Sequence, residues 1–399
     1  MKYLFLIADG MGDWPLDELN ARTPLQAAVT PHMDALAKQG IVGTCRTVPA
    51  GMPPGSDVAN MALLGFNPAN HHTGRGPIEA AAQGLELADN DLVWRCNLVT
   101  VSELSVNGFM RDYSAGHITT EKAMPLLRGL QMRFGSPRFT FHPGVQYRHL
   151  LVQKGAAGSD EAGIHVQPPH DITDKSIAAS MESYKANPPL NELVMRASHW
   201  LAEDADNNTK ANAIWPWGQG RPLRLPSFEK AHGLKGAVIS AVDLIKGLGR
   251  AADMEVLDVP GVTGLLDTNY AGKVRAALDF LSHGDFVFVH LEGPDECGHG
   301  GDIDCKVEAI NRFDRLIVGP LREALVGEPA AFLVTCDHLT PIALKTHHAD
   351  PVPFLLNWPG CSEPSGVGEF NELSAAQGVR VSKGHELLPW VLAKTGRGA

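Results

Sequence analysis

Three apolar segments of this chain each end beside an acidic residue. The segments are residues 2–8, 285–291 and 331–336, and they are rich in Phe, Leu and Val. Such runs are typical of strands in a parallel sheet that is covered on both faces. Because ligands gather at the carboxyl ends of parallel strands, the residues that follow these segments should meet at one edge of the sheet. The pattern therefore predicts an α/β fold with a ligand site at that edge.

The residues after these segments are carboxylates and histidines. Oxygen and imidazole ligands in this number suit a pair of divalent ions such as Mn²⁺, Zn²⁺ or Mg²⁺. One of the adjacent histidines His347 and His348 should turn back to the same place. The other candidate ligands are Asp9, Asp295, His299, Asp337 and His338.

The spacing of Asp295 and His299 leaves two local structures open. A helix would put both side chains on one face. Glycines at 293, 298, 300 and 301 favour instead a loop wrapped around an ion. The alternative role is a cap for the helix expected from Ile303, but Asp302 and Asp304 can fill that role.

A second motif is Ser56, which follows a Pro/Gly-rich loop and precedes an expected helix at residues 57–64. The free amides and the dipole of a helix N-terminus favour an anion there. A metal bound to the hydroxyl would favour the alkoxide, which is a nucleophile for phosphorus. The alternative is an ordinary N-cap serine. Beside so many metal-ligand types, we prefer the nucleophile.

The middle of the chain has a different pattern. A strand at 92–101, a helix at 119–134 and two strands near 138–142 and 147–152 predict a small α+β insert. We place this insert at residues 91–170, with 1–90 and 171–399 forming the metal-binding domain. Arginine binds phosphate or carboxylate bidentately, although each arginine also has an ordinary role in surface solvation. The candidate substrate-binding residues on or near the insert are Arg75, Arg95, Arg111, Asp112 and Arg148.

Charge and composition exclude several classes of protein. A net charge of −11 argues against a nucleic-acid surface, and no apolar run is long enough to span a membrane. The N-terminal apolar run is too short for a signal peptide and leads straight into Asp9. The six cysteines form no CxxC pair, so we expect free thiols and a cytoplasmic protein.

In combination, these motifs resemble the cofactor-independent phosphoglycerate mutases of the archaeal type, in the alkaline phosphatase superfamily. The matching stretches are residues 7–13, 54–60, 73–79, 294–299 and 337–353. The resemblance implies an alkaline-phosphatase-like, mostly parallel sheet flanked by helices. It implies one metal at Asp9, Ser56, Asp337 and His338, and a second at Asp295, His299 and His347. His347 is preferred to His348 because the family histidine lies four residues before the proline, here Pro351.

The resemblance also implies a reaction. Ser56 would take the phosphoryl group of 3-phosphoglycerate as a phosphoserine and return it to the other hydroxyl of glycerate, giving 2-phosphoglycerate. The insert would hold glycerate and exclude water. The implied cofactors are two divalent ions, Mn²⁺ first, with Zn²⁺, Mg²⁺ or Co²⁺ as alternatives. The implied partner is a small phosphorylated substrate.

The chain departs from the archaeal pattern in the insert. Ser114 and His117 stand where archaeal mutases carry two further arginines. The stretches 168–172 and 214–218 resemble a bacterial branch of the family that has been proposed to phosphorylate homoserine. A homoserine-kinase-like phosphotransferase and a phosphomonoesterase are therefore the alternative enzymes. A metal-dependent scaffold or sensor is the non-enzyme alternative.

Overall fold

The computed structural model describes residues 1–397, and the chain divides into two compact units. The first unit combines residues 1–72 with the chain from Arg224 onward, and the second unit is Thr73–Leu223. The expected insert at 91–170 lies inside the second unit, which begins earlier and ends later than expected. The later end arises because the segment Ala213–Gly220 returns as a strand to the sheet of the second unit.

The first unit is built on an eight-stranded, mostly parallel sheet. Its strands are β1 (Lys2–Ala8), β2 (Ile41–Cys45), β8 (Gly236–Ile239), β9 (Glu255–Val256), β10 (Phe286–Leu291), β11 (Ala330–Thr335), β12 (Val352–Asn357) and β13 (Val379–Val381). Their order is β13-β2-β12-β11-β1-β10-β8-β9, and β12 runs antiparallel to both of its neighbours. The three segments that the sequence predicted as strands are thus the adjacent central strands β11, β1 and β10.

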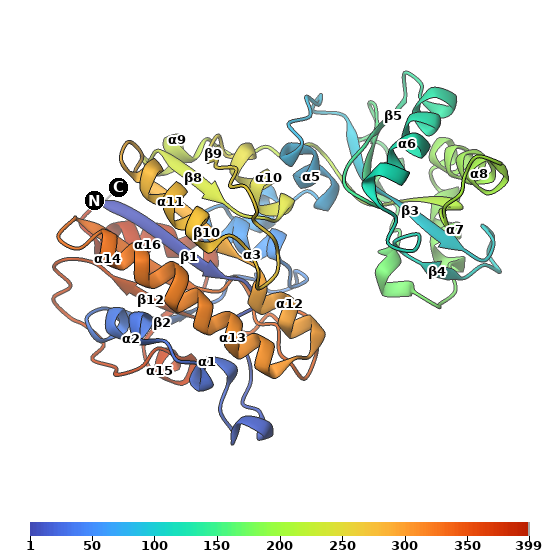
Figure 1. Cartoon of the computed structure of the whole chain (residues 1–399). Helices are drawn as coiled ribbons and strands as arrows, with labels where there is room; N and C mark the ends of the chain where they lie inside the picture. Colours follow the sequence, from blue (N-terminus) through green and yellow to red (C-terminus); the bar gives the residue numbers. More distant parts are fainter. Residues whose placement is uncertain (398–399) are drawn as a thin grey trace. The chain divides into compact units, whose positions relative to one another are not determined.

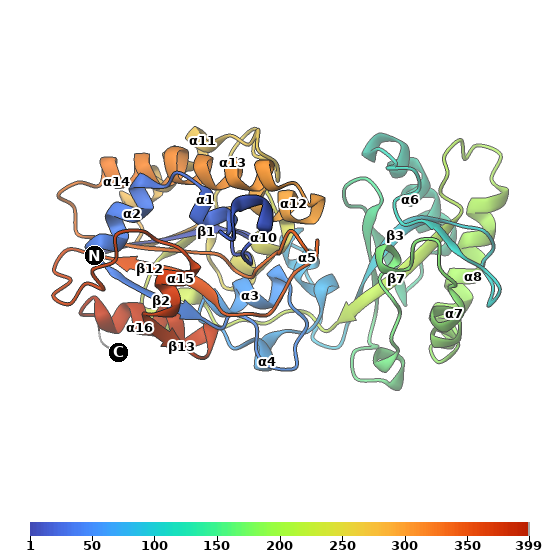
Figure 2. The same cartoon turned by 90° about the horizontal axis from the view of Figure 1, so that it is seen from below.

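Helices cover both faces of this sheet, which is why the central strands are apolar on both sides. β10 and β11 are buried along their whole lengths. In two perpendicular views, α11, α13 and α14 lie on one side of the sheet, and α3 and α16 lie on the other (Figures 1 and 2). The helices are α1 (Pro24–Ala27), α2 (Pro31–Lys38), α3 (Ser56–Leu63), α4 (Pro68–His71), α9 (Phe228–His232), α10 (Asp243–Ala251), α11 (Tyr270–Leu281), α12 (Gly293–Gly300), α13 (Ile303–Phe313), α14 (Gly319–Ala324), α15 (Glu372–Ala376) and α16 (Leu387–Lys394). The predicted α/β class is confirmed.

The segment that carries Asp295 and His299 is the helix α12, so the expected wrapped loop is wrong. Pro294 is preorganised for a first helical turn, and acidic residues in that turn suit the helix dipole. Gly301 ends the helix in the left-handed conformation, with φ +69°. Gly298 within the helix is required by packing, because a Cβ there would lie 2.6 Å from the carbonyl oxygen of Thr340.

The second unit is an antiparallel sheet packed against helices. The strands are β3 (Leu92–Val101), β4 (Met110–Asp112), β5 (Phe139–His142), β6 (Arg148–Gln153) and β7 (Ala213–Gly220), and the helices are α5 (Arg75–Ala82), α6 (Thr120–Phe134), α7 (Ala178–Lys185) and α8 (Pro188–Glu203). β3 pairs with β4, β6 and β7. The apolar core includes the fully buried Trp94, Trp215 and Tyr184. Within residues 1–397, neither unit contains a helix long and apolar enough to cross a membrane.

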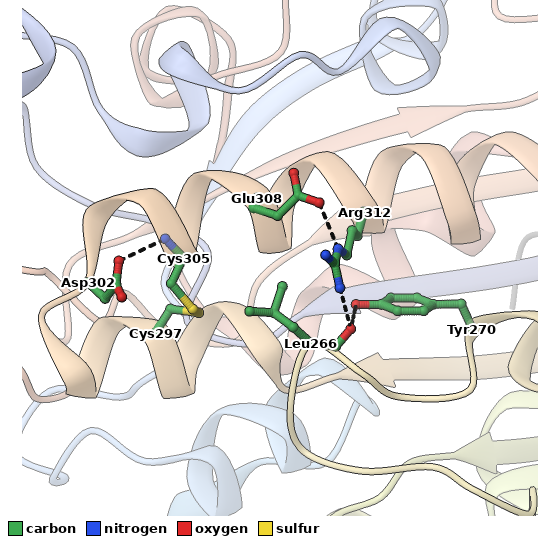
Figure 3. The surroundings of a disulfide bond; sticks show 7 residues. All are labelled: Leu266, Tyr270, Cys297, Asp302, Cys305, Glu308 and Arg312. Atoms are coloured by element: carbon green, nitrogen blue, oxygen red, sulfur yellow. Dashed lines mark hydrogen bonds and ion pairs between the residues drawn. A yellow bond between two sulfur atoms is a disulfide. The ribbon is translucent and has the colours of Figure 1, made fainter.

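The expectation that all six cysteines are free is wrong for two of them. A disulfide joins Cys297 in α12 to Cys305 in α13, with their Cα atoms 5.5 Å apart. Figure 3 shows this bond at the turn between the helices, where Asp302 also accepts a hydrogen bond from the amide of Cys305. The spacing of eight residues follows none of the familiar motifs, and the pairing arises because α12 folds back on α13. The free-thiol argument for the cytoplasm therefore does not apply to this pair.

We predict that the Cys297→Ser/Cys305→Ser double variant is less stable than the wild type by about 2–3 kcal/mol, because a short loop is no longer closed in the unfolded chain. Differential scanning calorimetry with and without dithiothreitol measures the effect. Reductant should lower the Tm of the wild type and of a Cys361→Ser control, and leave the double variant unchanged. A Tm of the wild type that is insensitive to reductant would contradict the prediction.

Candidate metal centre

The loops that follow β1, β10 and β11 meet at one edge of the sheet because the three strands are paired in register. Ala8 at the end of β1 lies opposite Leu291 at the end of β10. Ile7 lies opposite Thr335 at the end of β11. Asp9 and Asp337 therefore follow adjacent strands at nearly the same level, and α12 starts beside them.

The first group of side chains consists of Asp9, Asp337, His338 and Ser56. His338 Nε2 lies 3.5 Å from Asp9 Oδ1 and 3.4 Å from Asp337 Oδ2. Ser56 Oγ lies 3.1 Å from the same His338 nitrogen. The two aspartates and His338 are almost completely buried. The structure thus brings together all four residues that the resemblance assigns to one ion.

The second group consists of Asp295, His299 and His347. His299 Nε2 lies 3.2 Å from Asp295 Oδ2 and 3.0 Å from His347 Nε2. His347 Nε2 lies 3.5 Å from Asp295 Oδ1. His299 Nδ1 donates to the carbonyl of Lys345, which leaves Nε2 of the neutral ring free to bind a cation. His348 instead faces Asp350, 3.4 Å away.

His290 belongs to the same site, although the sequence analysis did not select it. It is fully buried in β10, with Nε2 3.1 Å from Asp9 Oδ2 and Nδ1 3.2 Å from Ser240 Oγ. Asp9, His290 and Asp337 offer atoms within 4.8 Å of one another, as do Asp295, His338 and His347. The sequence signal for His290 is that it is a polar residue within an otherwise apolar strand that is buried on both faces.

The electrostatics of the site show a surplus of buried negative charge. Burial raises the pKa of Asp9 well above its usual range, and repulsion by Asp337 and Asp295 raises it further. Burial opposes ionisation of Asp295 too, but hydrogen bonds with His299 and His347 hold its pKa well below the usual range. The hydrogen bond to Asp295 raises the pKa of His299 to about 9. A metal cation bound in place of the His299 proton would also offset the repulsion of Asp9 by Asp337 and Asp295.

The residues present fit divalent cations. Carboxylate and imidazole are the donor types that Mn²⁺ and Zn²⁺ bind. Asp9 Oδ1 and His290 Nε2 are buried and make no well-directed hydrogen bond with the described residues, although His290 Nε2 lies 3.1 Å from Asp9 Oδ2 and Asp9 Oδ1 lies 3.5 Å from His338 Nε2. Buried polar atoms are normally satisfied, and an ion is one way to satisfy them. The donor sets are therefore suited to positive charge.

Gly10 allows the loop after β1 to approach α12. Its φ of +63° is left-handed, and a Cβ there would lie 2.7 Å from Asp295 Oδ1 and 2.6 Å from Thr340 Oγ1. Its amide donates to Asp337 Oδ1, and Asn60 donates to Asp337 Oδ2. The glycine that follows Asp9 is thus required by the close packing of this loop against α12 and Thr340.

Ser56 is not the N-cap of α3. The cap position is Gly55, and α3 has no side-chain cap hydrogen bond. Ser56 is the first helical residue, and its hydroxyl points to His338. The geometry therefore removes the ordinary capping role that was the alternative for this serine.

In the second unit, Arg95 is the centre of a cationic cluster. It pairs with Glu79 at 3.0 Å and lies over the ring of Trp217, 4.4 Å from its centroid. Burial lowers the pKa of Arg95, and the charges of Arg75 and Arg148 add to this effect. Arg95 thus lies close enough to two further guanidinium groups to be affected by their charges, and guanidinium groups favour an anion.

The other two predicted substrate residues have different partners. Arg111 is half exposed and lies 3.7 Å from Asp174. Asp112 accepts hydrogen bonds from Ser114 and the amide of Gly116, so its side chain closes a turn. Ser114 in turn accepts a hydrogen bond from the amide of His117. The residues that replace the expected arginines therefore build this turn.

The chain is similar over most of its length to known proteins. A family model described as 2,3-bisphosphoglycerate-independent phosphoglycerate mutase matches residues 37–207. A probable 2,3-bisphosphoglycerate-independent phosphoglycerate mutase of Geobacter sulfurreducens is 44% identical over 402 residues, which cover 98% of this chain and 100% of the relative. The enzyme of that name from Methanosarcina barkeri is 45% identical over 387 residues, 95% of this chain and 96% of its own.

Two solved structures are similar over nearly the whole chain. The PH0037 protein of Pyrococcus horikoshii has a TM-score of 0.83 and 30% identity, and the match covers 100% of this chain and 98% of the other. The cofactor-independent phosphoglycerate mutase of Thermoplasma acidophilum has a TM-score of 0.67 and 29% identity, and the match covers 99% of this chain and 100% of the other.

We predict that Gly10→Ala destabilises the protein much more than Gly327→Ala. Both glycines have positive φ, but a Cβ at Gly327 meets no atom within 4 Å. The control should lose only the conformational term of about 1–2 kcal/mol. Gly10→Ala should lose a further ~1–3 kcal/mol, because the new methyl group displaces Asp295 and Thr340. Urea unfolding measures both, and equal losses would show that the close approach is unimportant.

Proposed function

Since the chain belongs to the 2,3-bisphosphoglycerate-independent phosphoglycerate mutase family, we propose that it interconverts 3-phosphoglycerate and 2-phosphoglycerate through a phosphoserine at Ser56. The observation that carries the proposal is the position of the Ser56 hydroxyl. It lies at the start of α3 and 3.1 Å from His338, beside two groups of carboxylates and imidazoles. This combination suits a nucleophile for phosphorus.

The two groups would hold two divalent ions. Asp9, Ser56, Asp337 and His338 would bind one ion, and Asp295, His299 and His347 would bind the other. We infer Mn²⁺ first, with Zn²⁺, Mg²⁺ and Co²⁺ as alternatives. When bound, such ions neutralise charge on the transferring phosphoryl oxygens and favour the alkoxide of serine.

The residues of the chain would do the rest. Ser56 Oγ forms a bond to phosphorus as the bond between phosphorus and the 3-oxygen of glycerate breaks. The free amides of the first turn of α3 support the negative charge of the phosphoryl group. The 2-hydroxyl of glycerate then attacks phosphorus, and the bond to Ser56 Oγ breaks. Ser56 Oγ and the 2-hydroxyl each release one proton as they attack, and the 3-oxygen and Ser56 Oγ each take one up as they leave. Atoms and charge therefore balance over the two transfers, and no further reactant is needed.

We propose that the second unit holds the glycerate part of the substrate and excludes water. Arg75, Arg95 and Arg148 are the candidate ligands of the carboxylate, because the charges of Arg75 and Arg148 both act on the buried Arg95. Water must be excluded because it would hydrolyse the phosphoserine and turn the mutase into a phosphatase. Arg111 and Asp112 remain candidates, although the bonds of Asp112 are directed to its own turn.

Phosphorus NMR of the wild type with 3-phosphoglycerate tests the reaction. The proposal predicts 2-phosphoglycerate with little free phosphate. Free phosphate alone would indicate a phosphomonoesterase. Absence of turnover, together with ATP-dependent phosphorylation of homoserine, would replace the mutase with the homoserine-kinase-like alternative.

We predict that Ser56→Ala lowers kcat by several orders of magnitude, because the reaction has no other covalent route. The fold should persist, since Ala is a good helix former and Ser56 makes no cap. Asn269→Ala is the matched control, because its side chain does cap α11 and its loss should cost about 1 kcal/mol of stability with kcat unchanged. If Ser56→Ala keeps more than about a tenth of kcat, equivalent to ~1.4 kcal/mol, the phosphoserine mechanism is wrong.

A further inference from the structure

A fully buried lysine, Lys306 on α13, lies behind the candidate metal centre. Its exposed fraction is 0%, and its ammonium group has three acceptors. Lys306 Nζ donates to Asp13 Oδ2 at 2.7 Å, to the carbonyl of Thr340 at 2.8 Å and to the carbonyl of Gly12 at 3.2 Å. The three N–H groups of the ammonium are therefore all used, and none is directed to solvent.

These acceptors come from two separate loops. Gly12 and Asp13 belong to the loop that starts with Asp9 after β1. Thr340 belongs to the loop that starts with Asp337 after β11. Lys306 lies one residue after Cys305, whose disulfide partner Cys297 is on α12. The ammonium group of Lys306 thus joins the loops after β1 and β11 to α13, and the disulfide joins α13 to α12.

Thr340 transmits this contact to the candidate ligands. Its hydroxyl donates to Asp295 Oδ1 and lies 3.3 Å from His338 Nδ1. Its carbonyl is held by Lys306 and packs against Gly298, where a Cβ would leave only 2.6 Å. A shift of the Thr340 backbone would therefore also displace the hydroxyl that bonds to Asp295 and lies beside His338.

Asp13 makes the arrangement rigid. Its carboxylate is fully buried and also accepts hydrogen bonds from the amides of Trp14 and Ile342, one from each loop. A buried ion pair is a weak source of net stability, because desolvation offsets most of the attraction. Its geometry, by contrast, is specific, because each partner is fixed by further hydrogen bonds.

We propose that Lys306 is a positioning residue for the metal centre. It fixes Thr340 so that Asp295 and His338 are held ready for metal capture, and it does not itself touch a metal or the substrate. This inference rests on the proposed function, because it assumes that the two groups of ligands bind divalent ions. Residues that orient metal ligands typically change metal affinity by about 10–100-fold when they are replaced.

The test is calorimetric titration of Mn²⁺ into metal-stripped protein, with the Tm of the metal-free protein as the second readout. Lys306→Met should weaken Mn²⁺ binding by about 10–100-fold and lower the Tm, because Asp13 is left buried without its counter-charge. Ile310→Ala is the matched control. Ile310 lies one turn further on the same buried side of α13, and its truncation should lower the Tm with the Kd of Mn²⁺ unchanged within about twofold.

A second variant separates the effect of Lys306 on the position of Thr340 from the cost of leaving a charge buried without its partner. Lys306→Met/Asp13→Asn removes both charges, so its Tm should recover relative to Lys306→Met while the Kd stays weakened. Thr340→Val should weaken Mn²⁺ binding less in this double variant than it does in the wild type. The reason is that Lys306 and Thr340 act on the ligands through the same contact, so their effects are not additive. Recovery of the Kd in the double variant, or a Kd of Lys306→Met within twofold of the wild type, would overturn the positioning role. A wild type that binds no Mn²⁺ would overturn the proposed metal centre itself, and the role of Lys306 with it.

Discussion

Mutual repulsion among three buried carboxylates is the constraint on which the rest of the structure depends. Asp9, Asp295 and Asp337 lie at the end of adjacent strands or at the helix beside them, and all are nearly inaccessible to water. Leaving ionised carboxylates unpaired in such surroundings costs several kcal/mol each. Burial and the neighbouring carboxylates raise the pKa of Asp9, and the hydrogen bond to Asp295 raises the pKa of His299 to about 9. The arrangement of these side chains is thus suited to positive charge.

Hydrogen-bond donors around these carboxylates stabilise their negative charge. The amide of Gly10 and the side chain of Asn60 both bind Asp337, and the hydroxyl of Thr340 binds Asp295. The parallel pairing of β1 with β10 and β11 sets the level of the three loops. These hydrogen bonds hold the carboxylates of Asp295 and Asp337 in fixed positions.

Much of this site follows from local sequence patterns. Strand burial on both faces explains why the apolar runs at 2–8, 285–291 and 331–336 were identified as strands. The ends of these runs then indicate Asp9 and Asp337 directly, because the end of an apolar run can be read from the local sequence. His347 could be distinguished from His348 by the family resemblance, and the geometry at Asp295 supports that choice.

Other features depend on contacts that no local pattern encodes. The glycines of α12 favour a loop by their helix propensity. The segment is nevertheless helical, and Gly298 is needed there because its position packs directly against Thr340. The disulfide between Cys297 and Cys305 requires that α12 fold back on α13. The pairing of β7 with β3 joins residues more than a hundred positions apart, so the end of the second unit was placed too early. Lys306 looks like a surface residue in the sequence, and only its three acceptors reveal its position.

The central claim is that two divalent ions bind at the ends of these strands. Crystals grown with Mn²⁺ and measured on both sides of the manganese absorption edge test it directly. We expect two anomalous peaks. One should lie within coordination distance of Asp9, Asp337 and His338, and the other within coordination distance of Asp295, His299 and His347. A single peak, or peaks away from these two groups, would contradict it.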